Sequence, residues 1–275
     1  MTILKRLFNF YIFSNLHVSL AVFSLTKVTL LHYGIDSNRI PLFNFFATFL
    51  SYNFIRIYNF RMLQPWYRGF SVKNKRTLFI LNLFSLIMTV WLVSRFSLTI
   101  FFFLAIFFFL TLFYVVPLNF NKQHPVTFRN IAFIKLADIA FCWAGVTVFI
   151  PLYHYGIPFS KTEIILFTQR ILLVAAITIP FDIRDVFTDD KALQTLPQAM
   201  GILNAKLTGT VFLFLFIVLG FSSSLETEPN FIIESIVAFV SVLFLWRSSH
   251  KQHTYYTAFW IEGIPIFWLL LVLSF

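Results

Sequence analysis

Residues 100–110 read IFFFLAIFFFL, an unbroken run of apolar side chains. The lipid-facing strands of a membrane barrel alternate apolar with polar residues, so this run argues against a barrel. An α-helix needs about 20 apolar residues to cross roughly 30 Å of hydrocarbon. The apolar character continues over residues 97–116, which is long enough. The stretch therefore predicts a transmembrane helix and places the protein in the all-α class.

The rest of the chain has the same character. Of its 275 residues, 59% are hydrophobic, only 12% are charged and 40 are Phe, and the mean hydropathy is +0.83. This composition excludes an ordinary water-soluble domain. We expect one integral-membrane domain over residues 1–275, a polytopic bundle of about nine transmembrane helices. The predicted spans are 11–33, 40–60, 77–95, 97–116, 131–153, 163–183, 205–223, 230–247 and 257–275.

The basic residues lie mainly at the edges of these spans, although the net charge of +10 would also suit a nucleic-acid-binding protein. This placement is typical of membrane proteins, so we expect membrane lipids and not nucleic acid as partners. The N-terminus and the even-numbered loops carry fourteen Lys and Arg residues, whereas the odd-numbered loops carry three. By the positive-inside rule, the N-terminus and the even loops face the cytoplasm, and we expect a multi-pass protein of the plasma (inner) membrane.

The longest polar insertion between spans covers residues 182–204 and belongs to a cytoplasmic loop. If the preceding helix continues past Pro180 by two turns, Asp182, Asp185 and Asp189 stand at i, i+3 and i+7 and share one face. Hard oxygen ligands at this spacing are what Mg²⁺ shared with a substrate diphosphate requires. The alternative is a solvated acidic helix end, balanced by neighbouring basic residues. The spacing alone favours neither interpretation.

Two segments match motifs of a known family. The loop contains Asp182-Ile183-Arg184-Asp185, then Asp189, then Thr195-Leu196-Pro197 and Gly201. This order resembles the second aspartate-rich motif of the UbiA superfamily of intramembrane prenyltransferases, in which DxxxD precedes a Thr-Leu-Pro-like turn and a Gly. Tyr114-Val115-Val116-Pro117-Leu118, with Arg129-Asn130 beyond it, is similar to the family's YxxPL segment. The family's usual Gly before the Thr-Leu turn is missing, and Leu193 and Gln194 stand in that region.

The first motif of that family, NxxxDxxxD, is also missing. Its place reads SYNFIRIYNFR at residues 51–61, and aligning the motif on Asn53 puts Ile57 and Arg61 where both aspartates belong. No shift recovers a carboxylate, because no acidic residue occurs between Asp36 and Asp138. The departure is therefore not a misalignment.

The resemblance implies a cavity, open to the cytoplasm, in which a prenyl group passes from a prenyl diphosphate to an aromatic or other lipophilic acceptor. Asp185 and Asp189, assisted by Asp182, would be the catalytic carboxylates and would hold Mg²⁺. The expected substrate-binding residues are Asn53, Arg56, Arg61, Tyr114, Lys122, Arg129 and Lys191. In one interpretation, Arg56 and Arg61 with a basic residue of the next loop replace a metal ion as diphosphate clamps. In the other, the site has decayed and its Arg–Asp contacts are structural.

Two other functions stay open. A non-catalytic protein of the same fold, with or without a bound prenyl lipid, is favoured by the missing first motif. A transporter would need repeated halves, interrupted helices or acidic residues near the bilayer midplane. Lys135 and Asp138 are the sole candidate for an ion-relay pair in the sequence. We expect them to form a structural ion pair within one helix.

Three further features are not assigned to the predicted site. Arg170, inside a span, needs a buried anionic or carbonyl partner. Glu226, Glu228 and Glu234 lie on the exoplasmic side and are expected to be solvated. The single cysteine, Cys142, excludes an intrachain disulfide and a Cys-rich metal site.

Overall fold

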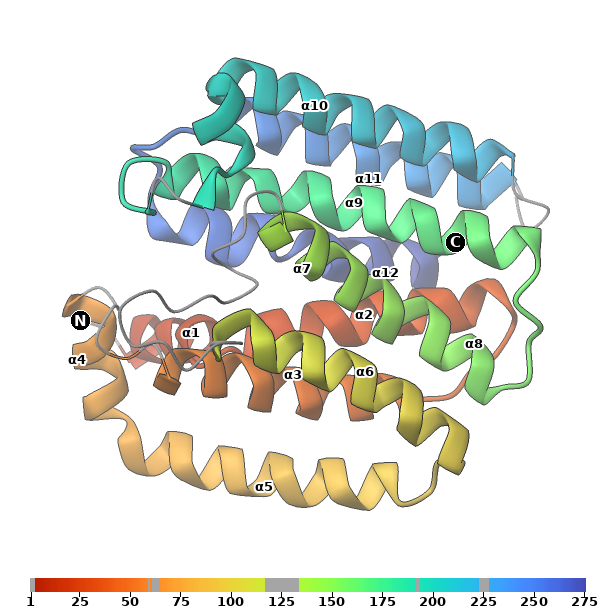
Figure 1. The fold of residues 1–275 in the computed structure, drawn as a ribbon, viewed down its shortest axis with the longest axis horizontal. Helices are drawn as coiled ribbons and strands as arrows, with labels where there is room; N and C mark the ends of the chain where they lie inside the picture. The colour runs from red at the N-terminus through yellow and green to blue at the C-terminus, as the bar shows by residue number, and fades with distance from the viewer. Residues whose placement is uncertain (1–2, 59, 61–64, 117–133, 191–192, 223–227) are drawn as a thin grey trace.

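The computed structural model describes residues 3–58, 60, 65–116, 134–190, 193–222 and 228–275. Within these residues all regular secondary structure is helical, as the sequence predicts (Figure 1). The helices are α1 (Ile3–Phe13), α2 (Leu16–His32), α3 (Arg39–Tyr58), α4 (Pro65–Lys73), α5 (Lys75–Val93), α6 (Leu98–Val115), α7 (Ile134–Ala144), α8 (Ile150–His154), α9 (Lys161–Asp185), α10 (Leu196–Phe221), α11 (Glu228–Arg247) and α12 (Ile264–Ser274). Two π-helical turns, Gly145–Phe149 and Tyr256–Ile261, lead into α8 and precede α12.

The described chain contains seven helical spans long and apolar enough to cross a membrane. Helices α1 and α2 meet at an angle of 58° and are therefore not counted as one span. The count becomes eight if they form a single broken span. The break falls at Asn15, whose backbone is left-handed with φ of 77°. Helix α3 has 20 residues but is not among these spans, since Asn44, Asn53 and Arg56 make it more polar. A multi-pass helical membrane protein is therefore supported, and the count of nine stays a prediction.

Helix α9 lies in the middle of the bundle (Figure 1) and packs against α7, α10 and α11. Its start is fixed by a capping box between Ser160 and Glu163. The main hydrophobic core joins α9 to α2, α10, α11 and α12 through Leu25, Val28, Leu173, Ala176, Phe216, Val237 and Trp268. Helix α5 stands at the edge of the bundle with most of its apolar side chains exposed, as expected for a lipid-facing helix.

The sequence prediction is confirmed for one buried charge, Arg170, and is wrong for another, Glu234. Arg170 is 1% exposed and donates to the carbonyl oxygen of Leu25 at 2.9 Å and to Thr29 Oγ1 at 3.1 Å, which confirms a buried structural pairing. Glu234 was expected to be solvated, and this is wrong, because it is 4% exposed and accepts a hydrogen bond from Gln169 Nε2 at 3.0 Å. The reason is that Glu234 lies more than one turn inside α11, on the side facing α9 and α10.

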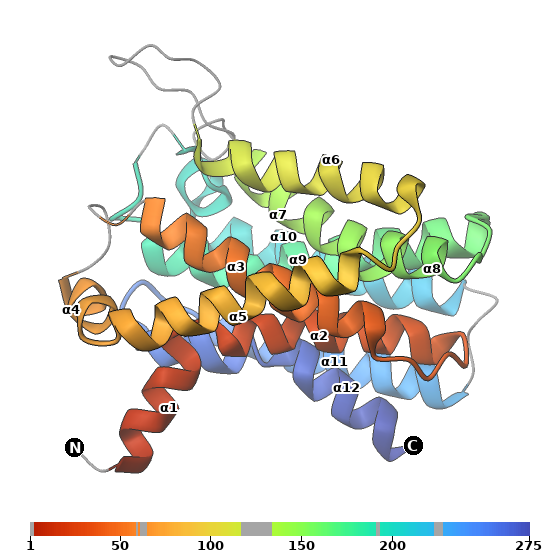
Figure 2. The same ribbon diagram turned by 90° about the horizontal axis from the view of Figure 1, so that it is seen from below.

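The two ends of the bundle are distinct. The N-terminus, α4, the ends of α3, α6 and α9 and the start of α10 lie at the left end in Figure 1, and the C-terminus lies towards the right. Seen from below, α1 leaves the bundle at a steep angle near α4 (Figure 2). This end carries the basic residues of α1 and α4, namely Lys5, Arg6, Arg68 and Lys73. The segments that carry the predicted motifs therefore meet at the basic end.

Candidate functional site

A cavity of about 620 Å³ opens among α3, α6, α7, α9 and the Tyr256–Ile261 turn. Part of its wall is apolar, including Ile139, Trp143, Val174, Ile177 and Phe181. Charged side chains line the remainder: the cations Arg56, Lys135 and Arg184, and the acids Asp138, Asp182, Asp185 and Glu262. A mixed lining of this kind suits a ligand with a polar head and an apolar tail.

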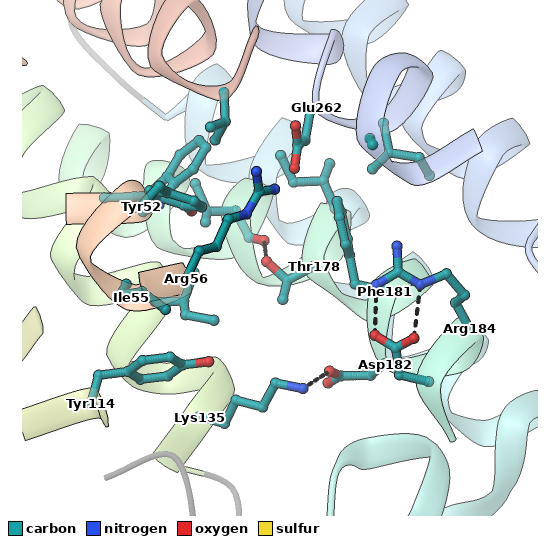
Figure 3. A pocket seen from close by; sticks show the side chains of 18 of the residues that line it. Tyr52, Ile55, Arg56, Tyr114, Lys135, Thr178, Phe181, Asp182, Arg184 and Glu262 are labelled. Carbon is teal, nitrogen blue, oxygen red and sulfur yellow. Dashed lines mark hydrogen bonds and ion pairs between the residues drawn. The ribbon is translucent and has the colours of Figure 1, made fainter. Parts of the chain in front are cut away.

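Lys135, at the start of α7, connects two of the predicted carboxylates. Its Nζ atom lies 2.8 Å from Asp182 Oδ1 (Figure 3). The same atom lies 2.9 Å from Asp189 Oδ2. All three side chains are largely buried, with exposures of 12%, 2% and 13%. Buried charges need such compensation, because losing water is costly for each ion. One ammonium thus holds the end of α9 and the loop after it together.

The predicted ion pair between Lys135 and Asp138 is wrong. The long Lys135 side chain reaches Asp182 of α9 and Asp189 of the following turn, and two carboxylates attract it more strongly than one would within its own helix. Asp138 instead accepts a weak hydrogen bond from the thiol of Cys142, with Sγ 3.9 Å from Oδ1. The Lys135–Asp138 ion pair, which was the candidate ion relay of a transporter, is therefore absent from the described structure.

Asp185 pairs with its neighbour in the chain. Arg184 donates from Nε and Nη2 to the two carboxylate oxygens of Asp185, at 2.8 and 2.6 Å. Its third nitrogen, Nη1, donates to Thr257 Oγ1 at 2.7 Å. This bidentate geometry is the strong form of an Arg–carboxylate contact. It also fixes the end of α9 against the last span.

The three aspartates do not share one continuous helical face. Helix α9 continues past Pro180 but ends at Asp185, and Asp189 lies in the turn that follows. That turn is held by the amide of Asp189, which donates to the Asp185 carbonyl oxygen at 2.8 Å. Gln198 Nε2 donates to the Asp189 carbonyl oxygen at 3.2 Å, from the first turn of α10. The loop fold, and not helical spacing, brings Asp189 beside Asp182.

The Thr-Leu-Pro segment and Gly201 have a structural explanation. Thr195 is the N-cap of α10 and forms a capping box with Gln198, and a proline stands in the first turn. Gly201 adopts φ of 85° and ψ of 158° at a kink in α10, a conformation almost restricted to glycine. Gln194, near the place of the missing family glycine, has φ of 42°.

Arg56 projects from the end of α3 into the cavity. Its Nη1 donates to the Phe13 carbonyl oxygen at 2.7 Å and to the Tyr67 hydroxyl. The Tyr67 ring lies under the guanidinium carbon at 4.5 Å, a cation–π contact. Tyr67 is buried, and burial raises the pKa of its phenol although Arg56 opposes this. Arg56 is thus oriented by hydrogen bonds to partners that carry no opposite charge.

Glu262 is the lining residue that the sequence analysis missed. It follows the π-helical Tyr256–Ile261 turn, and Figure 3 shows its carboxylate directed toward the Arg56 guanidinium across the cavity. Within the described residues, its side chain makes no hydrogen bond and no ion pair within 4 Å. The available signal was an isolated acid inside the apolar last span, which is a site hypothesis by itself.

The other predicted site residues divide into three groups. Tyr114 lines the cavity and points toward Lys135 (Figure 3). Asn53 is not a lining residue, because its amide accepts from Asn15 at 3.0 Å and donates to the Phe49 carbonyl oxygen at 2.9 Å, which secures the α1–α2 break. Its predicted contact with substrate stays a prediction. The remaining four lie outside the described residues: Arg61, Lys122, Arg129 and Lys191.

The lining fits Mg²⁺ through its donor chemistry. The described residues contain no group of three acidic, His or Cys side chains arranged as a ready metal cage. Mg²⁺ does not need one, since one or two carboxylates and substrate phosphates usually hold it. Asp182 and Asp189 already converge on one cation, the Lys135 ammonium. The lining also has four acids against three cations, so an added positive charge would be favoured.

The cavity therefore unites segments that are distant in the sequence, from α3, α6, α7, α9 and the last span. Comparison with protein-family models, curated proteins and solved structures finds no match.

Proposed function

We propose that the protein is an integral-membrane prenyltransferase of the UbiA type, with nine spans and a site open to the cytoplasm of a plasma (inner) membrane. The reaction moves a prenyl group from a prenyl diphosphate to an aromatic or other lipophilic acceptor. The observation that carries the proposal is the meeting of Arg56 and Tyr114 with Asp182 and Asp185 in one cavity. These residues belong to the segments whose order in the sequence resembles that family.

Arg56 is the residue best suited to bind the diphosphate. Its guanidinium can pair two phosphate oxygens at once, and it has no acidic partner within 4 Å in the described chain. Phe13 and Tyr67 hold it in place without neutralising it. The prenyl tail would then follow the apolar wall formed by Val174, Ile177 and Phe181. This wall excludes water, which protects a developing allylic cation from hydrolysis.

Charge balance predicts that diphosphate binding requires a further cation. With four acids and three cations lining the cavity, an anionic headgroup alone would be repelled. Asp185 and Asp189, assisted by Asp182, are the residues that would hold Mg²⁺. When bound, this ion would neutralise charge on the departing diphosphate. The ion would compete with Lys135 for Asp182 and Asp189, while Arg184 would keep Asp185 in position.

The test is incubation of the purified protein with labelled prenyl diphosphates of several lengths and a lipid extract. We expect a prenylated product from wild type, and a loss of roughly 100-fold or more in Asp185→Asn, because this removes a carboxylate expected to hold the Mg²⁺ that would neutralise the leaving group. Asp36→Asn is the matched control, since Asp36 lies outside the cavity and pairs with Lys27. Product formation unchanged by Asp185→Asn would contradict the site assignment.

A second candidate is a non-catalytic protein that binds a prenyl lipid. The observation that favours it is that all three aspartates are already paired with cations of the chain, Lys135 and Arg184. Such a protein would bind a prenyl diphosphate without releasing diphosphate. Parallel binding and product assays on the same preparation separate the two functions.

A further inference from the structure

We propose that Glu262 is the proton acceptor of the transfer reaction, an inference that rests on the function proposed above. A prenyl acceptor bears a hydrogen on its nucleophilic atom, and that proton must leave once the new bond has formed. A carboxylate inside the cavity can take it as a general base. Glu262 is the lining acid whose surroundings fit this task.

The other lining acids are engaged. Asp182 lies against Lys135, Asp185 is held by Arg184 through two hydrogen bonds, and Asp138 accepts from Cys142. In the described part of the chain, Glu262 alone among the lining acids has no side-chain hydrogen bond. Its oxygens are therefore available to a bound molecule.

The local backbone holds Glu262 in place. The amide of Glu262 donates to the Thr257 carbonyl oxygen at 3.1 Å, a spacing of five residues that closes the π-helical turn. The same turn is fixed from α2, because His17 Nε2 lies 2.9 Å from the Phe259 carbonyl oxygen. Single π-helical turns are frequent at functional sites, where the extra residue redirects a side chain. Here the redirected side chain faces the cavity.

The cations facing Glu262 are Arg56 from α3 and Arg184 from α9, and both have other partners. Arg56 donates to Phe13 and Tyr67, and Arg184 donates to Asp185 and Thr257. Neither forms an ion pair with Glu262 within 4 Å. The carboxylate thus faces the Arg56 guanidinium, the group expected to bind the diphosphate (Figure 3).

The chemical step balances without an oxidant or reductant. The bond between prenyl C1 and the diphosphate oxygen breaks, and its electron pair leaves with the diphosphate. The nucleophilic atom of the acceptor forms a bond to C1 and loses its proton. Glu262 takes this proton on a carboxylate oxygen and returns it to water after product release.

The experiment compares wild type with Glu262→Gln, which keeps the shape of the side chain and removes the base, and with Glu262→Asp, which keeps the base. We expect Glu262→Gln to bind a prenyl diphosphate within about threefold of wild type and to lose transfer by roughly 100-fold. Diphosphate release should fall less than transfer, because breaking the bond between prenyl C1 and the diphosphate oxygen does not require the base. Glu262→Asp should recover part of the transfer rate.

Three results would overturn the inference. Transfer by Glu262→Gln within about threefold of wild type would leave no role for the carboxylate. Equal losses of binding, diphosphate release and transfer would indicate a structural role. If wild type itself releases no diphosphate from any donor, the proposed function fails and the role of Glu262 fails with it, so the two failures are distinguishable.

Discussion

The ammonium of Lys135 lies 2.8 Å from Asp182 and 2.9 Å from Asp189, so one cation of α7 bridges two acids from α9 and the following loop. The arrangement places a cation of the chain where the resemblance predicts a metal ion. Together with the ion pair between Arg184 and Asp185, this bridge explains how three carboxylates lie close to one another despite their mutual repulsion. It also means that Mg²⁺ would compete with, or displace, a side chain.

Replacing this cation should destabilise the protein strongly. In Lys135→Met, Asp182 and Asp189 lose their shared partner while Asp182 stays buried, and we expect a loss of about 3–5 kcal/mol. Thermal unfolding in detergent measures the effect, with Lys161→Met at the opposite end of the bundle as control. Mg²⁺ should raise the melting temperature of the variant more than that of wild type, because the freed carboxylates bind it. Equal melting temperatures of wild type and Lys135→Met would refute the bridge.

Positive backbone φ angles predict opposite effects of substitution at two positions, Gly201 and Gln194. Gly201→Ala should cost about 1–3 kcal/mol, since φ of 85° strains any residue with a Cβ although no atom lies within 4 Å of it. Gln194→Gly, at φ of 42°, should stabilise by about 0.5–1 kcal/mol.

Gly69→Ala is the matched control for the Gly201 substitution. It lies in α4 with equally open surroundings and without positive φ, so alanine should be tolerated or slightly favoured. Thermal melting of the three variants gives the comparison. A loss at Gly69 as large as that at Gly201 would remove the argument from backbone strain.

Arg56 should control the affinity for the donor more than the stability of the fold. Arg56→Lys keeps the charge but loses the planar donor pair, and we expect donor binding weaker by about tenfold. Tyr67→Phe removes one orienting hydroxyl and keeps the ring under the guanidinium, so its effect should be smaller. Titration with a labelled prenyl diphosphate checks both variants. Wild-type affinity in Arg56→Lys would mean that Arg56 does not bind the headgroup.

The helical fold was predictable because apolar runs of membrane length are local signals. The break at Asn15 was not, since it depends on an amide contact from Asn53, far along the chain. The same holds for the turn that carries Asp189, which Gln198 stabilises from α10. The prediction that Asp182, Asp185 and Asp189 share one helical face required the helix to continue to Asp189, and it ends at Asp185.

The site was predictable only in part. Arg56, Tyr114, Asp182 and Asp185 were named from the sequence, and all four line the cavity. Lys135 was recognised as a buried charge but given the wrong partner, because its partners come from another helix. Glu262 was not predicted, because no sequence motif surrounds it and only the folded structure shows that it lines the cavity.

Cys142 provides the most direct measurement of whether the cavity binds a prenyl diphosphate. It is the one cysteine of the chain and lines the cavity, so the rate of its modification by a small thiol reagent reports occupancy. With Mg²⁺ present, a saturating prenyl diphosphate should slow modification by about tenfold, whereas the matching prenol should have little effect. Equal rates with and without the diphosphate would contradict the account.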